Sequence, residues 1–197
     1  MRQIVSAALI ILLCACSTLK TVPGPSGDWE SRRAELQQLE YWQFRARIAV
    51  RDGAEGGQGN LAWTQQGPSS DLRLSGPLGF GSWRVVWDDS QVTVFSKDGE
   101  RALNYTGEAA AEAFVASQLG WSFPVSSTRY WLLGLLDTRY PGRELFDADG
   151  QLTGLEQHGW TVTFKRFVEV DAQLLPGGLV MDHAEGQMRV AIHQWQL

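Results

Sequence analysis

The side chains that could carry covalent chemistry are few in this sequence, and the most reactive of them lie near its start. Cys14 and Cys16 are the only cysteines, so residues 17–197 offer no thiol for a disulfide, a cysteine-based zinc site or a nucleophile. The three histidines lack the spacing of a metal-binding motif such as HExxH, and no G-x-S-x-G nucleophile turn occurs. The sequence therefore predicts no catalytic residue, no metal site and no cofactor.

Cys16 ends a short apolar segment. Residues 4–15 are almost all apolar, but a helix that crosses a bilayer needs about 20 such residues. The segment closes with the letters LCAC at positions 13–16, which is the lipobox pattern of lipoprotein signal peptides. We therefore predict that residues 1–15 are removed and that Cys16 carries a covalent lipid. The alternative is an ordinary signal peptide with an incidental cysteine.

A lipidated Cys16 would anchor the chain to a membrane. Such a cysteine bears more than one acyl chain, which stable anchorage requires. Ser17 follows it in place of aspartate, and by resemblance to bacterial lipoproteins in general this favours the outer membrane. Residues 16–27 contain Pro, Gly and Ser without periodic apolar positions, which predicts a flexible tether. The folded domain is expected over 28–197.

The composition restricts what this domain can bind. The 17 Lys+Arg against 22 Asp+Glu leave no basic excess for a phosphate backbone, which argues against nucleic acid as a partner. Nine Trp, eight Phe and four Tyr are far too many aromatic residues for a disordered chain. We therefore expect a folded domain with a large apolar interior.

Hydrophobic periodicity predicts mostly strands. A period of two runs through 42–51, and similar short apolar segments follow between Gly, Pro, Asp and Ser clusters. A glycine-rich link is expected over 52–59. Helices are expected over 28–40 and 108–119, with a short one starting at 126 or 127 and running to about 135. The expected strands are 42–51, 60–66, 71–75, 82–88, 91–96, 101–105, one near 145, 151–157, 160–167, 179–183 and 187–195.

This order of elements predicts a mainly β fold. About eleven strands in one antiparallel meander suggest a single strongly curved sheet, with helices packed against its concave side. Such a sheet could close into a barrel, or stay open and use the helices as a lid. For any one aromatic residue, ordinary core packing is the simpler explanation. Taken together, however, so curved a sheet with three modest helices would leave an apolar cavity that binds apolar ligands.

The candidate cavity residues are the apolar positions of the first six strands and of the later helices. Which strand face points inward follows from hydrophobicity alone, and a shift of one residue would invert a strand. The expected cavity lining is Phe44, Ala46, Ile48, Val50, Leu61, Trp63, Leu72, Leu74, Val85, Trp87, Val92 and Val94. The expected lid residues are Phe114, Leu119, Trp121, Trp131, Leu132 and Leu135.

Several short motifs, in their order and spacing, resemble the LolB family of outer-membrane lipoprotein receptors. The resemblance runs from the lipobox to Trp195 and so covers nearly the whole chain. One departure is Leu135-Leu136, where the family commonly has a proline. The motifs are RIAV at 47–50, WTQ at 63–65, LSGPLG at 74–79, GWSFPV at 120–125, YWLLG at 130–134 and GWTV at 159–162.

The resemblance implies an incomplete antiparallel barrel whose apolar cavity is covered by helices, and no enzyme activity. It implies a receptor that is anchored to the outer membrane through Cys16 and faces the periplasm, and a handover of one cargo at a time fits a monomer. It would accept the acyl chains of lipoproteins from a LolA-type periplasmic carrier and insert them into that membrane. An apolar residue of the 76–79 loop, by position Leu78 and assisted by Phe80, would help insertion. The alternative is that Leu78 folds back into the core.

Other classes of protein share some of these features. A lipocalin-like carrier of small hydrophobic ligands would have a cavity but would need no protein partner. A structural envelope lipoprotein would need neither cavity nor lid. A hydrolase would need an organised polar site, and no motif for one is visible in the sequence.

Overall fold

The computed structural model describes residues 21–22, 29–52, 55–76, 82–88, 90–96 and 100–197. Cys16, predicted to carry lipid, and Leu78 and Phe80, predicted to help insertion, lie outside these ranges. Within them, no helix is both long and apolar enough to cross a membrane.

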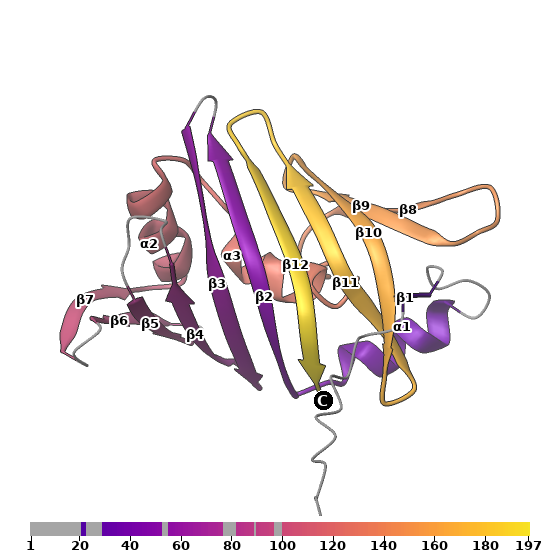
Figure 1. Cartoon of the computed structure of the whole chain (residues 1–197), viewed down its shortest axis with the longest axis horizontal. Coiled ribbons are helices and arrows are strands. Elements are labelled where there is room, and N and C mark those ends of the chain that lie inside the picture. Colours follow the sequence, from indigo (N-terminus) through magenta and orange to yellow (C-terminus); the bar gives the residue numbers. More distant parts are fainter. Residues whose placement is uncertain (1–20, 23–28, 53–54, 77–81, 89, 97–99) are drawn as a thin grey trace, which may run out of the picture.

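One antiparallel sheet forms most of the molecule (Figure 1). Its strands hydrogen-bond in the order β7-β6-β5-β4-β3-β2-β12-β11-β10-β9-β8, and the short strand β1 pairs with β10. The edge strands β7 and β8 are not paired with each other in the described part of the chain, so the barrel is incomplete. The predicted mainly β, open, curved sheet is therefore confirmed. The strands are β1 (Thr21–Val22), β2 (Tyr41–Asp52), β3 (Glu55–Gln66), β4 (Ser69–Ser75), β5 (Ser82–Trp87), β6 (Gln91–Phe95), β7 (Arg101–Thr106), β8 (Gly142–Phe146), β9 (Leu152–Gln157), β10 (Trp160–Val170), β11 (Gln173–Asp182) and β12 (Gln187–Gln196).

The central strand β2 shows why this sequence forms a half-buried sheet. Trp42, Phe44, Ala46 and Ile48 are buried, while the arginines between them point to the outer face. This alternation is the period of two that a strand with one buried face requires. Its neighbours β3 and β12 follow the same register, with Trp63 and Trp195 opposite Phe44. The inner face is therefore continuous across the three strands.

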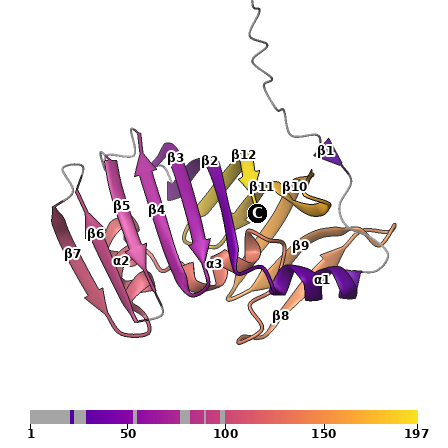
Figure 2. The ribbon, with the colours of Figure 1, turned by 90° about the horizontal axis from the view of Figure 1, so that it is seen from below.

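Three helices accompany the sheet, namely α1 (Trp29–Gln37), α2 (Ala110–Leu119) and α3 (Val125–Trp131). Helices α2 and α3 lie together on one side of the sheet, and α2 contacts both α3 and the strands β6 and β7 (Figure 2). Helix α1 lies at another part of the molecule, where Arg33 reaches Glu144 at 3.4 Å and the Gln173 side chain donates to Glu35 at 3.0 Å. Helix α1 buries Trp29 and Leu36 in the core, whereas α2 and α3 cover the part of the inner face that concerns the site.

Several segments differ from the expectation. The third helix ends at Trp131, short of the expected end near 135. The link predicted over 52–59 is shorter, because residues from Glu55 onward already pair with β2, as Gly57 does with Val50. The predicted strand 179–183 begins earlier, at Gln173, although Pro176 cannot donate to the ladder. The β10–β11 register shifts beside it, and Arg166 fills the irregularity by donating to the Gly177 carbonyl at 3.0 Å. Within the predicted tether, the Thr21–Val22 strand pairs with β10.

Candidate functional site

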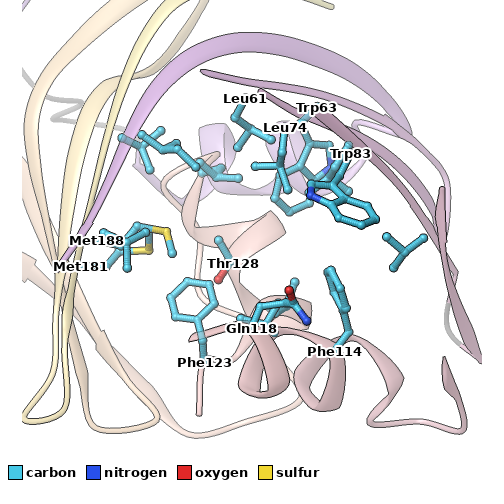
Figure 3. A pocket seen from close by; sticks show the side chains of 18 of the residues that line it. Leu61, Trp63, Leu74, Trp83, Phe114, Gln118, Phe123, Thr128, Met181 and Met188 are labelled. Atoms are coloured by element: carbon cyan, nitrogen blue, oxygen red, sulfur yellow. The ribbon is translucent and has the colours of Figure 1, made fainter. Parts of the chain in front are cut away.

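An apolar cavity of about 170 Å³ lies under the arch of the sheet, closed from below by α2 and α3 (Figure 3). Strands β2 to β7 and strands β11 and β12 supply its walls. The residues predicted from the sequence that line it are Ile48, Val50, Leu61, Trp63, Leu72, Leu74 and Val94 on strands, and Phe114 and Leu132 on the helical side. The residues that the sequence did not single out are Trp83, Leu103, Val115, Gln118, Phe123, Val125, Thr128, Met181, Met188 and Val190.

For some of the cavity residues that were not predicted, the sequence does contain a pattern that indicates an inward-facing side chain. Met188, Val190 and Ile192 alternate in the same way as the inner residues of β2. Their place at the cavity depends on the pairing of β12 with β2, in which Met188 faces Val50 and Val190 faces Ile48. That pairing joins the last strand of the chain to the first long one, and no local sequence pattern predicts it.

Five residues predicted to line the cavity are buried elsewhere. The side chains of Phe44, Ala46, Val85, Trp87 and Val92 point inward as expected, but other side chains cover them. The reason is an aromatic cluster at that end of the sheet, in which the ring of Phe44 lies 5.2 Å from that of Trp195, and Trp63 lies 5.4 Å from Trp87. Rings at these distances pack directly against one another, so this part of the inner face belongs to the core and not to the cavity.

Three predicted lid residues also pack away from the cavity. Trp121 lies 5.4 Å from the ring of Trp160, and the Trp131 indole N–H donates to Gln157 at 2.9 Å. Leu135 is fully buried, and its backbone N–H donates to the Tyr130 carbonyl at 3.0 Å, a bond that proline could not make. Leu119 ends α2, but its side chain is outside the described residues.

The wall of the cavity offers few polar groups, and most of these already have a partner. The Thr128 hydroxyl donates to the Pro124 carbonyl at 2.9 Å, and the Trp63 indole N–H donates to Gln65 at 3.1 Å. An apolar cavity of about 150 Å³ in another protein stays dry and takes up benzene. This cavity is therefore expected to exclude water and to favour hydrocarbon.

Helix α3 is fixed to the sheet by a buried polar network. Gln157 on β9 accepts from the Trp131 indole and from the Asp137 backbone N–H, and donates to the Asp137 and Tyr140 carbonyls at 2.8 and 2.9 Å. The Ser127 hydroxyl donates to Asp137 at 2.8 Å and lies 2.9 Å from His158 Nε2. The polar groups of this network thus have hydrogen-bond partners, and we expect α3 to be a rigid part of the cavity floor.

Ser127, His158 and Asp137 are the residue types of a hydrolase triad, but their hydrogen bonds are arranged differently. Asp137 accepts the hydroxyl proton of Ser127 directly, so His158 Nε2 can only donate to the same oxygen. Burial opposes the charge on Asp137, yet its hydrogen bonds from Arg139 and Ser127 outweigh this and hold the pKa of its carboxyl below the usual range. A nucleophilic serine needs a free base on its proton, and this arrangement provides none.

This network borders a second hollow of about 840 Å³, which is polar. Its wall includes the ionisable side chains of Glu112, Arg139, His158 and His183. Hydrocarbon placed there would desolvate charged groups, which costs free energy. The smaller apolar cavity is therefore the better candidate for an apolar ligand.

Helix α2 is held less firmly than α3. Its Glu112 carboxylate accepts from the backbone N–H and hydroxyl of Ser126 at 3.0 and 2.7 Å, which ties it to α3. Towards the sheet, the Tyr105 hydroxyl meets Ser117 at 3.0 Å in a solvent-exposed contact, and the ring of Phe114 packs on Tyr105. Because exposed hydrogen bonds are weakly stabilising, we expect α2 to separate from the edge strand β7 more easily than α3 separates from the sheet.

Comparison with known proteins agrees with this geometry. The family model described as "Outer membrane lipoprotein LolB" matches residues 40–195. A protein named outer-membrane lipoprotein LolB from Nitrosococcus oceani is 34% identical over 193 residues, covering 95% of this chain and 94% of its own. One of the same name from Pseudomonas aeruginosa is 31% identical, covering 100% of this chain and 96% of its own.

A solved structure shows the same fold at much lower sequence similarity. The crystal structure of a LolA superfamily protein from Nitrosomonas europaea superposes with a TM-score of 0.53 at 10% identity, over 85% of this chain and 90% of that one. The open sheet with helices on its inner side is therefore shared with LolA-like proteins. The family model matches residues 40–195, and both relatives align over nearly their full length, so this chain belongs to the LolB family of outer-membrane lipoproteins.

Proposed function

We propose that this chain is an outer-membrane receptor that accepts lipoproteins from a LolA-type periplasmic carrier, holds their acyl chains in the apolar cavity and inserts them into the membrane. The observation that carries this proposal is the apolar cavity enclosed by the sheet and by α2 and α3. Membership of the LolB family supports it.

The energy of moving an acyl chain explains why a cavity is needed. Burial of one CH₂ group is worth about 0.8 kcal/mol, so a chain of about sixteen carbons gains on the order of 10 kcal/mol by leaving water. Escape through water would therefore be extremely slow. A receptor avoids it by presenting its cavity directly to that of the carrier, so that only the difference in affinity drives the transfer. We expect no nucleotide and no catalysis in this step.

In this structure the cavity is too small for a whole acyl chain. A cavity of about 150 Å³ takes a ligand the size of benzene, and this one has about 170 Å³. A whole chain therefore needs a wider cavity or must extend beyond it, and we expect widening at α2 and β7, which meet through an exposed hydrogen bond and a ring contact. Helix α3 would stay in place as a floor, since its network with Gln157 and Asp137 is buried.

The loop predicted to assist insertion continues two strands of the cavity wall. Leu74 and Trp83 both line the cavity and face each other across β4 and β5, whose connection carries Leu78 and Phe80. An apolar group on this connection would place a membrane contact next to the site that holds the acyl chain. We expect Leu78→Glu to keep cargo binding and to impair insertion. Loss of cargo binding with unaffected release would refute this role.

The remaining features of the proposal concern anchorage and assembly. Lipid on Cys16 would hold the domain at the periplasmic face of the outer membrane, and no cofactor beyond that lipid is needed. A monomer suits a transfer of one cargo at a time. Incorporation of labelled palmitate is expected in the native chain and should vanish in Cys16→Ser.

A transfer assay tests the function directly. A carrier loaded with a lipoprotein is mixed with this protein, and the cargo is followed on each partner after separation. We expect the cargo to move to the receptor without added nucleotide. Cargo that stays on the carrier at every receptor concentration would disprove the proposal and leave a lipocalin-like carrier of small hydrophobic ligands as the better explanation.

A further inference from the structure

One tryptophan that lines the cavity has an indole N–H without a hydrogen-bond partner in the described part of the chain. The indole nitrogen of Trp83 is buried and has no hydrogen-bond partner there, although the side chain lines the cavity (Figure 3). Trp63 lines the same cavity, but its N–H is already donated to Gln65. Two other buried indoles without a partner, those of Trp29 and Trp121, do not line it. Trp83 thus differs from all of these.

The chemistry of this group restricts its partner. An indole N–H can only donate, so its partner must offer an acceptor oxygen. A buried donor without an acceptor destabilises the protein that contains it, and a ligand that supplies the acceptor recovers that loss. Water is a poor candidate in a cavity walled almost entirely by hydrocarbon, because a buried water needs two or more polar partners. The carbonyl oxygen of an acyl ester is an acceptor that arrives attached to hydrocarbon.

The position of Trp83 suits the head end of an acyl chain. Trp83 is the second residue of β5 and follows the connection that carries Leu78 and Phe80. In Figure 3, Trp83 lies on one side of the cavity and Met181 and Met188 lie on the other. An ester held at Trp83 would therefore direct its hydrocarbon across the cavity towards the two methionines, whose flexible side chains adapt to different chain shapes.

We propose that Trp83 donates its indole N–H to the ester carbonyl oxygen of a bound acyl chain and so fixes the direction and depth of that chain in the cavity. The proposal rests on the acyl-binding function above and adds a polar contact to it. The receptor would thereby distinguish acyl esters from other hydrocarbon chains of equal length.

Two probes that differ only in the carbonyl test this contact. One is 1-palmitoyl-lysophosphatidylcholine, an ester, and the other is 1-O-hexadecyl-lysophosphatidylcholine, its ether analogue. Their dissociation constants are measured by titration calorimetry on the full chain carrying Cys16→Ser, so that no lipid of the protein itself competes for the cavity. We expect the ester to bind about fivefold more tightly, which corresponds to about 1 kcal/mol for one hydrogen bond.

The variants assign this preference to one side chain. Trp83→Phe keeps an aromatic ring and removes only the N–H with part of the ring, so it should bind both probes equally. Trp63→Phe is the matched control, since it also removes an indole from the wall, and it should keep the ester preference even if both affinities fall.

The outcomes separate this inference from the function on which it rests. Equal binding of ester and ether by the native side chains, or an ester preference that survives Trp83→Phe, would overturn the role of Trp83 and leave the acyl cavity intact. Failure of both probes to bind at all would instead count against the acyl-binding function itself.

Discussion

The two ends of the inner face of the sheet are formed by the same strands, but one end is tightly packed and the other contains a cavity. At one end, the rings of Trp42, Phe44 and Trp195 pack within about 6 Å of one another. At the other end, Ile48 and Val190 leave a cavity of about 170 Å³. Along β2 the inner residues alternate at both ends, and on β12 a bulge between Ile192 and Gln194 keeps Trp195 on the same face as Val190. Side-chain size and the distance to the covering helices therefore decide whether the face becomes core or binding site.

The helices that cover this face differ in a similar way. Helix α3 is attached through the buried side chain of Gln157, whereas α2 meets the sheet through the exposed Tyr105–Ser117 contact. Buried, fully paired networks resist local opening, and exposed contacts do not. A receptor must keep its shape and also admit a long acyl chain. A firmly attached α3 and a weakly attached α2 would meet these two requirements.

The largest expected effect is at the filled end. Phe44→Ala should lower the free energy of unfolding by about 3–5 kcal/mol, because it opens a void in a packed aromatic cluster. Leu61→Ala should cost about 2 kcal/mol, since one side of Leu61 already faces the cavity and fewer contacts are lost. Urea unfolding of both variants measures the difference. Equal losses would show that the two ends are packed alike.

A change in the network of α3 should come next. Gln157→Leu removes the acceptor of the buried Trp131 bond, the donor of the buried bond to the Asp137 carbonyl and the donor of the part-buried bond to the Tyr140 carbonyl. We expect a loss of about 2–3 kcal/mol and faster hydrogen exchange in α3. Gln66→Leu, at an exposed position of β3, is the control and should leave both quantities nearly unchanged. Unchanged exchange in α3 would contradict its role as the firm cover.

The same network predicts a dependence of stability on pH. The pKa of Asp137 is held below its usual range in the folded protein, so its contribution is present above the ordinary carboxyl pKa of about 4 and is lost as the pH falls through the lower folded value. Urea unfolding from about pH 6 to about pH 3 should show this loss. Asp137→Asn cannot titrate, so its decline over this range should be smaller. A parallel decline would place the acid sensitivity elsewhere.

The smallest expected effect on stability comes from filling the cavity. Val190 and Ile192 lie on the same face of β12, but only Val190 lines the cavity. Val190→Phe should leave the unfolding free energy nearly unchanged and block uptake of an acyl probe, whereas Ile192→Phe should cost about 1–3 kcal/mol by overpacking. Titration with the acyl probe measures its uptake, and urea unfolding measures the free energy of unfolding. A Val190→Phe variant that binds normally would exclude this cavity as the acyl site.

The strand pattern of the sequence was sufficient for much of the fold. The period of two in β2, the short apolar runs that became β4 to β7, and the alanine-rich segment of α2 all depend on local preferences, and they were predicted close to their observed ranges. The glycines before Asn60 and the Pro-Gly-Gly run in β11 misled the prediction, because pairing with a neighbouring strand overrode local turn propensity.

The candidate site could be predicted only in part for a related reason. Inward-facing residues such as Ile48 and Phe44 have the same pattern, and the sequence cannot tell which of them has a neighbour across the interior. The contribution of Met181 and Val190 depends on β12 closing back onto β2, a contact between distant parts of the chain. Trp83 could not be recognised at all from sequence, since an unused indole N–H is a property of its surroundings.

By itself the sequence determined a curved antiparallel sheet with an apolar inner face, because alternation and helix propensity act between neighbouring residues. It also supplied the Cys16 lipobox and the motifs that resemble the LolB family. Only the tertiary structure decided which part of the inner face is hollow, which helix is held by a buried network and which indole of the cavity wall lacks a hydrogen-bond partner. These depend on how closely distant side chains approach one another, and no local pattern in the chain encodes that distance.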